Sequence, residues 1–278
     1  MDENEIRIMK ATNAVNNIIM NKVIELPYFN NKNLNNNISY FNKTIVEDED
    51  ILPDMYLAAY SSRINSIIVQ PKDVEKATDE QLVSILLHEH IHMLSSDMKN
   101  GNIGYNDGKE PVIFNEAATQ WLTLKLINEN NNMDDAIKNN VLYKESVKKI
   151  DDIIKCVGEE NFYSHYFDAS LKTMLEEQNE YNFNVIVNCL SDMKEANEEV
   201  LAEQELNKLK NNIIEYEQKN EKLKESKNTI SIKLNKINNN KVSIRTVVSN
   251  ALNQGISTEH VKKSDIEEQN LKNQQTKE

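Results

Sequence analysis

The chain has 278 residues, of which 39% are hydrophobic and 28% are charged, and its formal net charge is −13. This length fits one large domain, or one medium domain with an appendage, and the low apolar content indicates a compact part joined to a solvated part. The acidic charge argues against nucleic acid or a membrane surface as the main partner, because phosphate backbones and anionic lipids repel it.

The compartment is predicted from targeting signals and cysteine usage. The opening residues, MDENEIRIMK, are acidic and no apolar stretch follows them, so we recognise no signal peptide. No segment approaches the roughly 20 apolar residues that span a bilayer. Two cysteines, Cys156 and Cys189, make no disulfide framework. We therefore expect a cytoplasmic protein, with export by a route that needs no signal peptide as the alternative.

Residues 1–50 form a weakly patterned N-terminal segment, in which we expect a helix over Glu5–Val23 and an Asn-rich loop after Tyr28. Two β-prone stretches, MYLAAY and INSIIV, follow between Met55 and Val69. Next, Thr78-Asp79-Glu80-Gln81 has the spacing of a capping box, which predicts that a largely buried helix begins there.

This predicted helix contains LLHEHIHML, with three of the five histidines of the chain. His88 and His92 are four residues apart and share a helix face, so two imidazole nitrogens can reach one ion. Glu89 lies about 100° around the helix from His88, where it can hold a water bound to that ion. This spacing is the HExxH pattern of zinc enzymes. We expect His90, which faces elsewhere, to be a bystander.

A second helix, EAATQWLTLKLINE, is predicted after a loop that contains three of the five glycines. We expect Asn115 to cap this helix, and Trp121 and Leu122 to pack it against the histidine helix. Residues 135–195 have helical patterns in several pieces, with an interruption near Gly158.

Residues 196–240 are predicted to form a long helix, because apolar residues step by three and four along it. Residues at this spacing form a heptad seam over 206–237, in which Asn220 and Lys227 occupy two a positions. The helix can fold back on the domain, or it can pair as a coiled coil with a second copy or a partner helix. A hairpin of TISIKL and VSIRTVV is a further alternative. We expect the polar tail, 241–278, to be disordered. The seam consists of Leu206, Leu209, Ile213, Tyr216, Asn220, Leu223, Lys227, Ile230, Leu234 and Ile237.

HEHIH followed by Asn115-Glu116-Ala117-Ala118-Thr119 resembles the gluzincin branch of zinc metallopeptidases, over about residues 55–130. The resemblance implies an α+β fold for residues 51–195. Its zincin-like core would comprise a small β-sheet, the motif helix and a ligand helix, followed by a mostly α-helical C-terminal region.

The resemblance also implies one zinc ion per chain, held by His88, His92 and Glu116, with Glu89 as general base. Three protein ligands leave a fourth position for water, whose pKa zinc lowers from 15.7 to about 7. Glu89 would accept the water proton and return it to the leaving amine. As third ligand, Glu110, Asp97 and then an acidic stretch further on compete with Glu116.

Two departures from the best-known members concern the region around Glu116. Gln120 stands where they have an aspartate that orients a ligand histidine, and an amide oxygen can accept the same bond without charge. The 97–111 loop is also longer. The residue that steadies the oxyanion is left open among four candidates, of which we prefer the first: Tyr143, Tyr163, His165 and Tyr166.

The leading functional hypothesis is therefore a zinc-dependent metallopeptidase acting on a peptide or protein substrate. The alternative is a catalytically weak or inactive metal-binding interaction protein that acts through its C-terminal coiled-coil segment. Gln120 motivates this alternative, and Glu89 argues against it, because a purely structural zinc site has no use for a base beside an open position.

Overall fold

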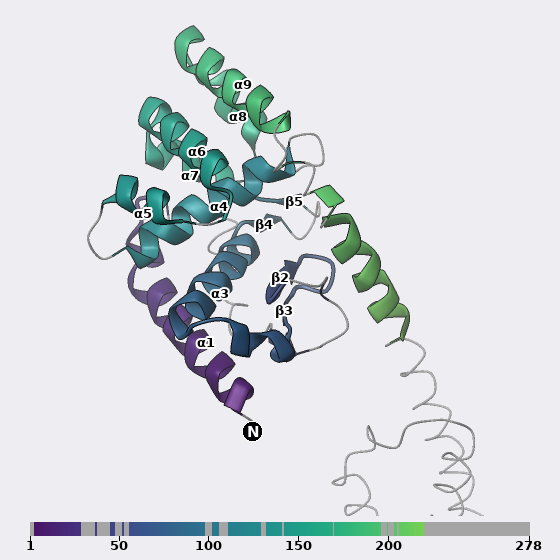
Figure 1. The fold of residues 1–278 in the computed structure, drawn as a ribbon. Coiled ribbons are helices and arrows are strands. Elements are labelled where there is room, and N and C mark those ends of the chain that lie inside the picture. Colours follow the sequence, from purple (N-terminus) through teal and green to yellow (C-terminus); the bar gives the residue numbers. More distant parts are fainter. Residues whose placement is uncertain are drawn as a thin grey trace, which may run out of the picture. The chain divides into compact units, whose positions relative to one another are not determined.

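The computed structural model describes residues 3–28, 37, 45–47, 52, 56–97, 102–105, 111–128, 132–140, 142–168, 170–195, 199, 203–204 and 206–219. The chain forms two compact units, Met1–Glu215 and Tyr216–Glu278. In the described part helices predominate and the strands form two small sheets, which agrees with the predicted α+β class (Figure 1). None of the described helices is long and apolar enough to cross a bilayer.

The histidine helix, α3 (Asp79–Leu94), begins at the predicted capping box. The Thr78 hydroxyl accepts a hydrogen bond from Gln81 N at 3.2 Å, and the Gln81 side chain accepts one from Thr78 N at 2.9 Å. These bonds satisfy two backbone donors that a helix N-terminus leaves without partners. Leu82 and Leu86 are fully buried, so the core fixes the orientation of α3.

The N-terminal helix, α1 (Glu3–Asn21), agrees with the helix predicted over Glu5–Val23, and it packs against α3. The guanidinium of Arg7 donates hydrogen bonds to Val74 O at 2.9 Å and to Ala77 O at 2.6 Å. Arg7 thereby ties α1 to the segment that leads into α3. The buried stripe of α1 consists of Ile8, Ala11, Val15 and Ile19.

Three short strands, β1 (Ile45–Glu47), β2 (Ala58–Ser61) and β3 (Ser66–Val69), form a sheet in the order β1-β3-β2. β1 runs parallel to β3, and β2 runs antiparallel to it. The hairpin of β2 and β3 comes from the two predicted β-prone stretches and packs on α3. Among the described strands β2 lies at an edge of this sheet, so one of its backbone edges faces away from β3. After α3, β4 (Ser96–Asp97) and β5 (Asn102–Ile103) form a two-stranded sheet.

The helix α4 (Val112–Ile127) begins earlier than predicted, so the expectation that Asn115 caps it was wrong. Pro111 precedes the first turn, and the Glu199 carboxylate accepts hydrogen bonds from Val112 N at 2.9 Å and Ile113 N at 2.7 Å. A carboxylate at this end of a helix satisfies open amides and complements the positive end of the helix dipole. Asn115 is thereby released from capping and lies inside the helix, buried.

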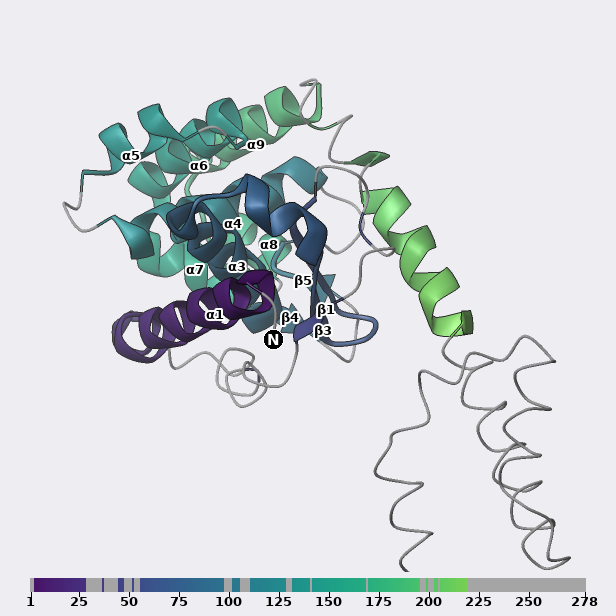
Figure 2. The same ribbon diagram turned by 60° about the horizontal axis from the view of Figure 1, so that its bottom comes forward.

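Between Met133 and Lys194 the described residues form the helices α5 to α9, and the predicted interruption lies at Gly158, whose φ of 85° suits glycine. α4 contacts α3 on one side and α5, α6 and α9 on the other (Figures 1 and 2). Trp121 and Leu122 are buried, as predicted for core residues. The bounds are α5 Met133–Asn139, α6 Lys144–Val157, α7 Glu159–Phe167, α8 Leu171–Glu176 and α9 Glu180–Lys194, with 3₁₀ turns at Val23–Glu25 and Pro71–Lys76.

Residues 206–219 are helical, as predicted for the start of the 206–237 seam. Leu206 and Leu209 are half-buried and Ile213 is 4% exposed, so the first seam residues face protein. The seam from Asn220 onward, the alternative hairpin and the tail 241–278 lie outside the described residues.

Candidate metal centre

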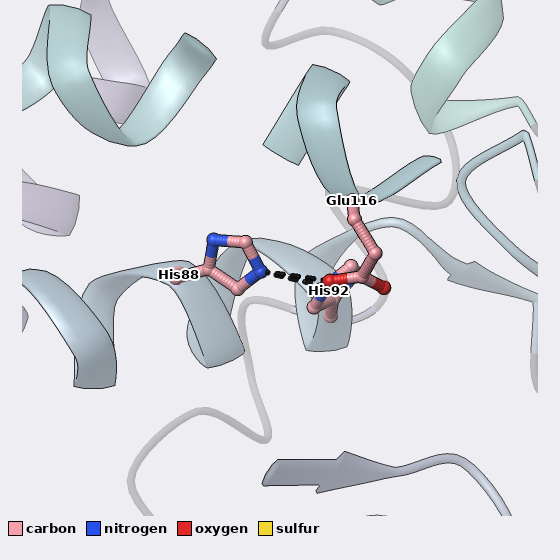
Figure 3. A group of neighbouring side chains, drawn as sticks. All are labelled: His88, His92 and Glu116. Atoms are coloured by element: carbon pink, nitrogen blue, oxygen red, sulfur yellow. Dashed lines mark hydrogen bonds and ion pairs between the residues drawn. The ribbon is translucent and has the colours of Figure 1, made fainter. Parts of the chain in front are cut away.

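The side chains of His88, His92 and Glu116 converge between α3 and α4 (Figure 3). The two Nε2 atoms are 3.0 Å apart, and Glu116 Oε2 lies 3.2 Å from His88 Nε2 and 3.3 Å from His92 Nε2. Both imidazoles are buried, and the Glu116 side chain is 23% exposed. The structure therefore brings together the three residues predicted as ligands.

These separations fit a tetrahedral ion. Zinc–ligand bonds of about 2.0–2.1 Å at tetrahedral angles put neighbouring ligand atoms roughly 3.3 Å apart. The three observed distances, 3.0, 3.2 and 3.3 Å, are close to that edge length. Three acceptor atoms this near each other repel unless a proton or a cation lies between them. The donor set and its spacing thus suit a divalent cation with an open fourth position.

The tautomer of His88 follows from the hydrogen bonds behind it. Leu142 fixes the Asn140 amide, because Leu142 O accepts from Asn140 Nδ2 at 2.5 Å and Leu142 N donates to Asn140 Oδ1 at 3.3 Å. Asn140 Oδ1 also accepts from Gln120 Nε2 at 3.2 Å, so the Gln120 oxygen faces His88 Nδ1, 2.9 Å away. Nδ1 must carry the proton, which leaves the Nε2 lone pair for a metal ion.

His92 is held in a similar way by the next turn of α4. Its Nδ1 lies 3.3 Å from Thr119 Oγ1, which donates to Asn115 O at 2.9 Å and pairs with the Tyr166 hydroxyl at 2.6 Å. Thr119 Oγ1 can therefore accept a hydrogen bond from the N–H of His92 Nδ1, and Nε2 again faces Glu116. The Asn115 amide lies farther from His92 Nδ1, at 3.5 Å, and its Oδ1 accepts from Tyr105 N.

Helix geometry explains why these contacts coincide. His88 and His92 share a face of α3, and positions 116, 119 and 120 share a face of α4, because both sets follow the i, i+3, i+4 spacing. Since the two helices pack together, one turn of α4 supplies a carboxylate between the rings and an acceptor behind each ring.

Glu89 lies beside this group, next to strand β2. Its Oε2 accepts a hydrogen bond from Tyr60 N at 2.7 Å. Burial raises the pKa of Glu89 to about 7, against the opposing effects of His88 and the Tyr60 N–H. Burial also raises the pKa of Glu116, but His92 and His88 outweigh it and lower that pKa well below its usual range. The two carboxyl groups thus differ in proton affinity although they share one pocket.

The four oxyanion candidates have different surroundings. Tyr143 lines the pocket that contains Glu89, His92 and Glu116. The Tyr163 hydroxyl donates to Ala118 O at 2.7 Å, and Tyr166 is engaged behind Thr119. His165 pairs with Glu177 and Ser170. Of the four, Tyr143 is the one that borders the pocket.

The remaining predicted residues lie apart from the metal group. His90 is buried with Nδ1 2.6 Å from Leu86 O, as expected for a bystander. Among the described residues, the His–His–carboxylate group contains Glu116 and does not include Asp97. The other competing ligand, Glu110, lies outside the described residues.

One hollow is lined by residues of the metal group, and a second, larger one borders Gln120. The pocket at Glu89 has a volume of about 90 Å³, and its lining includes Leu206 and Leu209, which come from the C-terminal part of the chain. A cavity of about 1010 Å³ lies along the N-terminal half of α3 and the C-terminal half of α4, bordered by Gln120 and Asn140. Its apolar lining residues include Leu57, Ile85, Leu124 and Ile127.

Sequence reasoning missed four residues that shape the centre: Tyr60, Thr119, Asn140 and Glu199. Thr119 belongs to the Asn-Glu-x-x-Thr pattern, and its spacing of three from Glu116 is the signal that could have indicated a contact with His92. The other three bond to residues far away in the sequence: Tyr60 is 29 positions from its partner, Asn140 is 20, and Glu199 is 86 and 87 from its two partners. Sequence periodicity carries no signal over such separations. No protein-family model, no curated protein and no solved structure matches the chain.

Proposed function

We propose that the chain is a zinc-dependent metallopeptidase in which His88, His92 and Glu116 hold the ion and Glu89 is the general base. The observation that carries the proposal is the near-tetrahedral spacing of the three ligand atoms, with an acceptor behind each ring. The resemblance of HEHIH and the Asn-Glu-x-x-Thr element to gluzincins agrees with this donor set.

Each residue then has a definable task. A zinc ion, when bound, supplies a Lewis acid that lowers the pKa of water and polarises a substrate carbonyl. Gln120 and Thr119 orient the two imidazoles. Glu89, whose Oε2 is held by Tyr60 N, takes the proton of the attacking water and delivers it to the leaving amine. Tyr143, at the border of the pocket, is the candidate donor to the oxyanion.

A peptide substrate is favoured by the position of β2. Tyr60 N donates to Glu89, so this backbone edge of the outer strand faces the metal group and not β3. An extended peptide can add to such an edge through main-chain hydrogen bonds. The cavity of about 1010 Å³ is at the upper end of the roughly 300–1,000 Å³ typical of ligand pockets, and we assign it to apolar substrate side chains.

The test is cleavage of unfolded casein by the zinc-loaded chain, with and without a chelator. We expect chelator-sensitive cleavage, and we expect Glu89→Gln to lower it by at least about 10²-fold while zinc stays bound. Glu80→Gln is the matched control, because it removes the same charge from an exposed position of α3. Full activity of the Glu89→Gln variant would contradict the role of this residue.

The second candidate function is a metal-binding interaction protein with little or no turnover. It is favoured by the small pocket at Glu89 and by the neutral Gln120 behind His88. No chelator-sensitive cleavage of several unrelated unfolded substrates, at full zinc occupancy, would favour this candidate over the peptidase.

A further inference from the structure

The segment after α9 reaches the pocket at Glu89. Leu206 and Leu209 line this pocket together with Glu89, His92 and Glu116. Both leucines are half-buried on a helix whose opposite face, with Lys208 and Asn211, is exposed. Further along the same unit, Ile213 is 4% exposed. The apolar face of residues 206–215 is therefore turned toward protein at the mouth of the metal group.

Glu199 anchors the start of this segment. Its carboxylate is 4% exposed and accepts from Val112 N and Ile113 N, the first amides of α4. α4 carries Glu116 one turn further on, so the anchor and the metal group share a helix. A buried carboxylate is costly unless it is hydrogen-bonded, and both oxygens of Glu199 are bonded.

The volume of the pocket is too small for a peptide. About 90 Å³ corresponds to about three water molecules at roughly 30 Å³ each, and ligand pockets are typically about 300–1,000 Å³. A water molecule and a metal ion fit, whereas a main chain with side chains on both sides of a scissile bond does not. For a peptide to reach Glu89 and Glu116, Leu206 and Leu209 therefore have to move.

We propose that Glu199 and residues 206–215 are an intramolecular cover that blocks substrate from the metal group. The inference rests on the proposed peptidase function and adds that the closed chain is a low-activity form. Glu199 fixes one end, and Leu206 and Leu209 fill the space that a substrate needs.

The sequence also provides a route for release. Leu206, Leu209 and Ile213 are the first three positions of the 206–237 seam. A helix that pairs with this seam needs the same apolar face that lies against the pocket. Covering the pocket and pairing with another helix are therefore mutually exclusive, and a helical partner or a second copy would open the site.

The test uses the full-length, zinc-loaded chain and the double variant Leu206→Ser/Leu209→Ser. The matched control is Asn207→Ser/Asn211→Ser, which also introduces two serines, but on the exposed face of the same helix. One readout is the rate at which excess 4-(2-pyridylazo)resorcinol extracts zinc, and the other is kcat/KM for unfolded casein. We expect the leucine variant to be faster in both by roughly tenfold or more, and the control to match the wild type.

Glu199→Gln is a second variant, in case the leucine variant folds poorly. An amide supplies one acceptor oxygen where the carboxylate supplies two, so we expect faster zinc extraction and faster hydrogen exchange at Val112 and Ile113. The proposal would be overturned if both folded variants released zinc at the wild-type rate. It would also be overturned if the wild type and the leucine variant cleaved casein with the same kcat/KM. Faster extraction with no cleavage by any variant would retain the cover and refute the peptidase. A chain that cannot be loaded with zinc refutes the proposed function, and the cover with it.

Discussion

Replacing Gln120 by leucine tests whether its amide oxygen orients His88. Gln120 is 3% exposed, and its Oε1 lies 2.9 Å from His88 Nδ1. Leucine has a similar volume and no acceptor, so the Nδ1–H loses its partner at a cost of about 1–3 kcal/mol. The ring can then rotate away from the metal group. Because Gln120 also borders the large cavity, water can partly replace the oxygen, which favours the lower part of that range.

We therefore expect Gln120→Leu to weaken zinc binding by about 10- to 100-fold, the effect typical of losing a partner behind a metal-bound histidine. The assay is a competition titration against a chelating dye, with circular dichroism to check that the variant is folded. Gln120→Glu is the control, because it keeps an acceptor oxygen and adds a charge, and it should bind zinc at least as tightly as the wild type. A folded Gln120→Leu variant whose zinc affinity stays within about twofold of wild type would refute this reasoning.

Three further outcomes are expected. Gly104→Ala should destabilise the fold by about 1–3 kcal/mol in urea unfolding. At the φ of +52° found there, an added Cβ would lie 2.3 Å from Asn115 Oδ1 and 2.4 Å from the Tyr166 ring. An unchanged urea midpoint would contradict this packing. Trp121→Phe should cost about 1–3 kcal/mol, since the buried Asp151 carboxylate loses the indole N–H that it accepts at 3.0 Å; equal thermal stability would show that this bond is dispensable. Removing zinc should lower the melting temperature, and free zinc at about 1,000 times its Kd should restore about 4 kcal/mol; a melting temperature insensitive to zinc would speak against binding to the folded state.

Local patterns predicted the elements that carry the metal group. The capping box at Thr78 and the i, i+4 histidines depend on residues within one or two helical turns, and the structure has both as expected. The β-prone stretches between Met55 and Val69 form the hairpin beside α3 for the same reason, since short-range alternation and flanking turns specify a strand.

The remaining features depend on contacts between distant segments. Asn115 looked like a helix cap, but Pro111 and the carboxylate of Glu199 begin α4 about one turn earlier. Asn140, which fixes the Gln120 amide, directly follows α5 and has no sequence signature for that role. β1 pairs in parallel with β3 across more than 20 residues, so no turn signal marks it. Such features follow from tertiary packing, which overrides local propensity.

The most direct measurement is the zinc content of the purified chain by mass spectrometry, for the wild type and for His92→Ala. We expect one zinc ion per wild-type chain and loss of that zinc in the variant, because two of three ligands cannot hold the ion in an open site. His165→Ala, which removes a histidine outside the metal group, should keep its zinc. Stoichiometric zinc in His92→Ala, or no zinc in the wild type, would contradict the assignment of the metal centre.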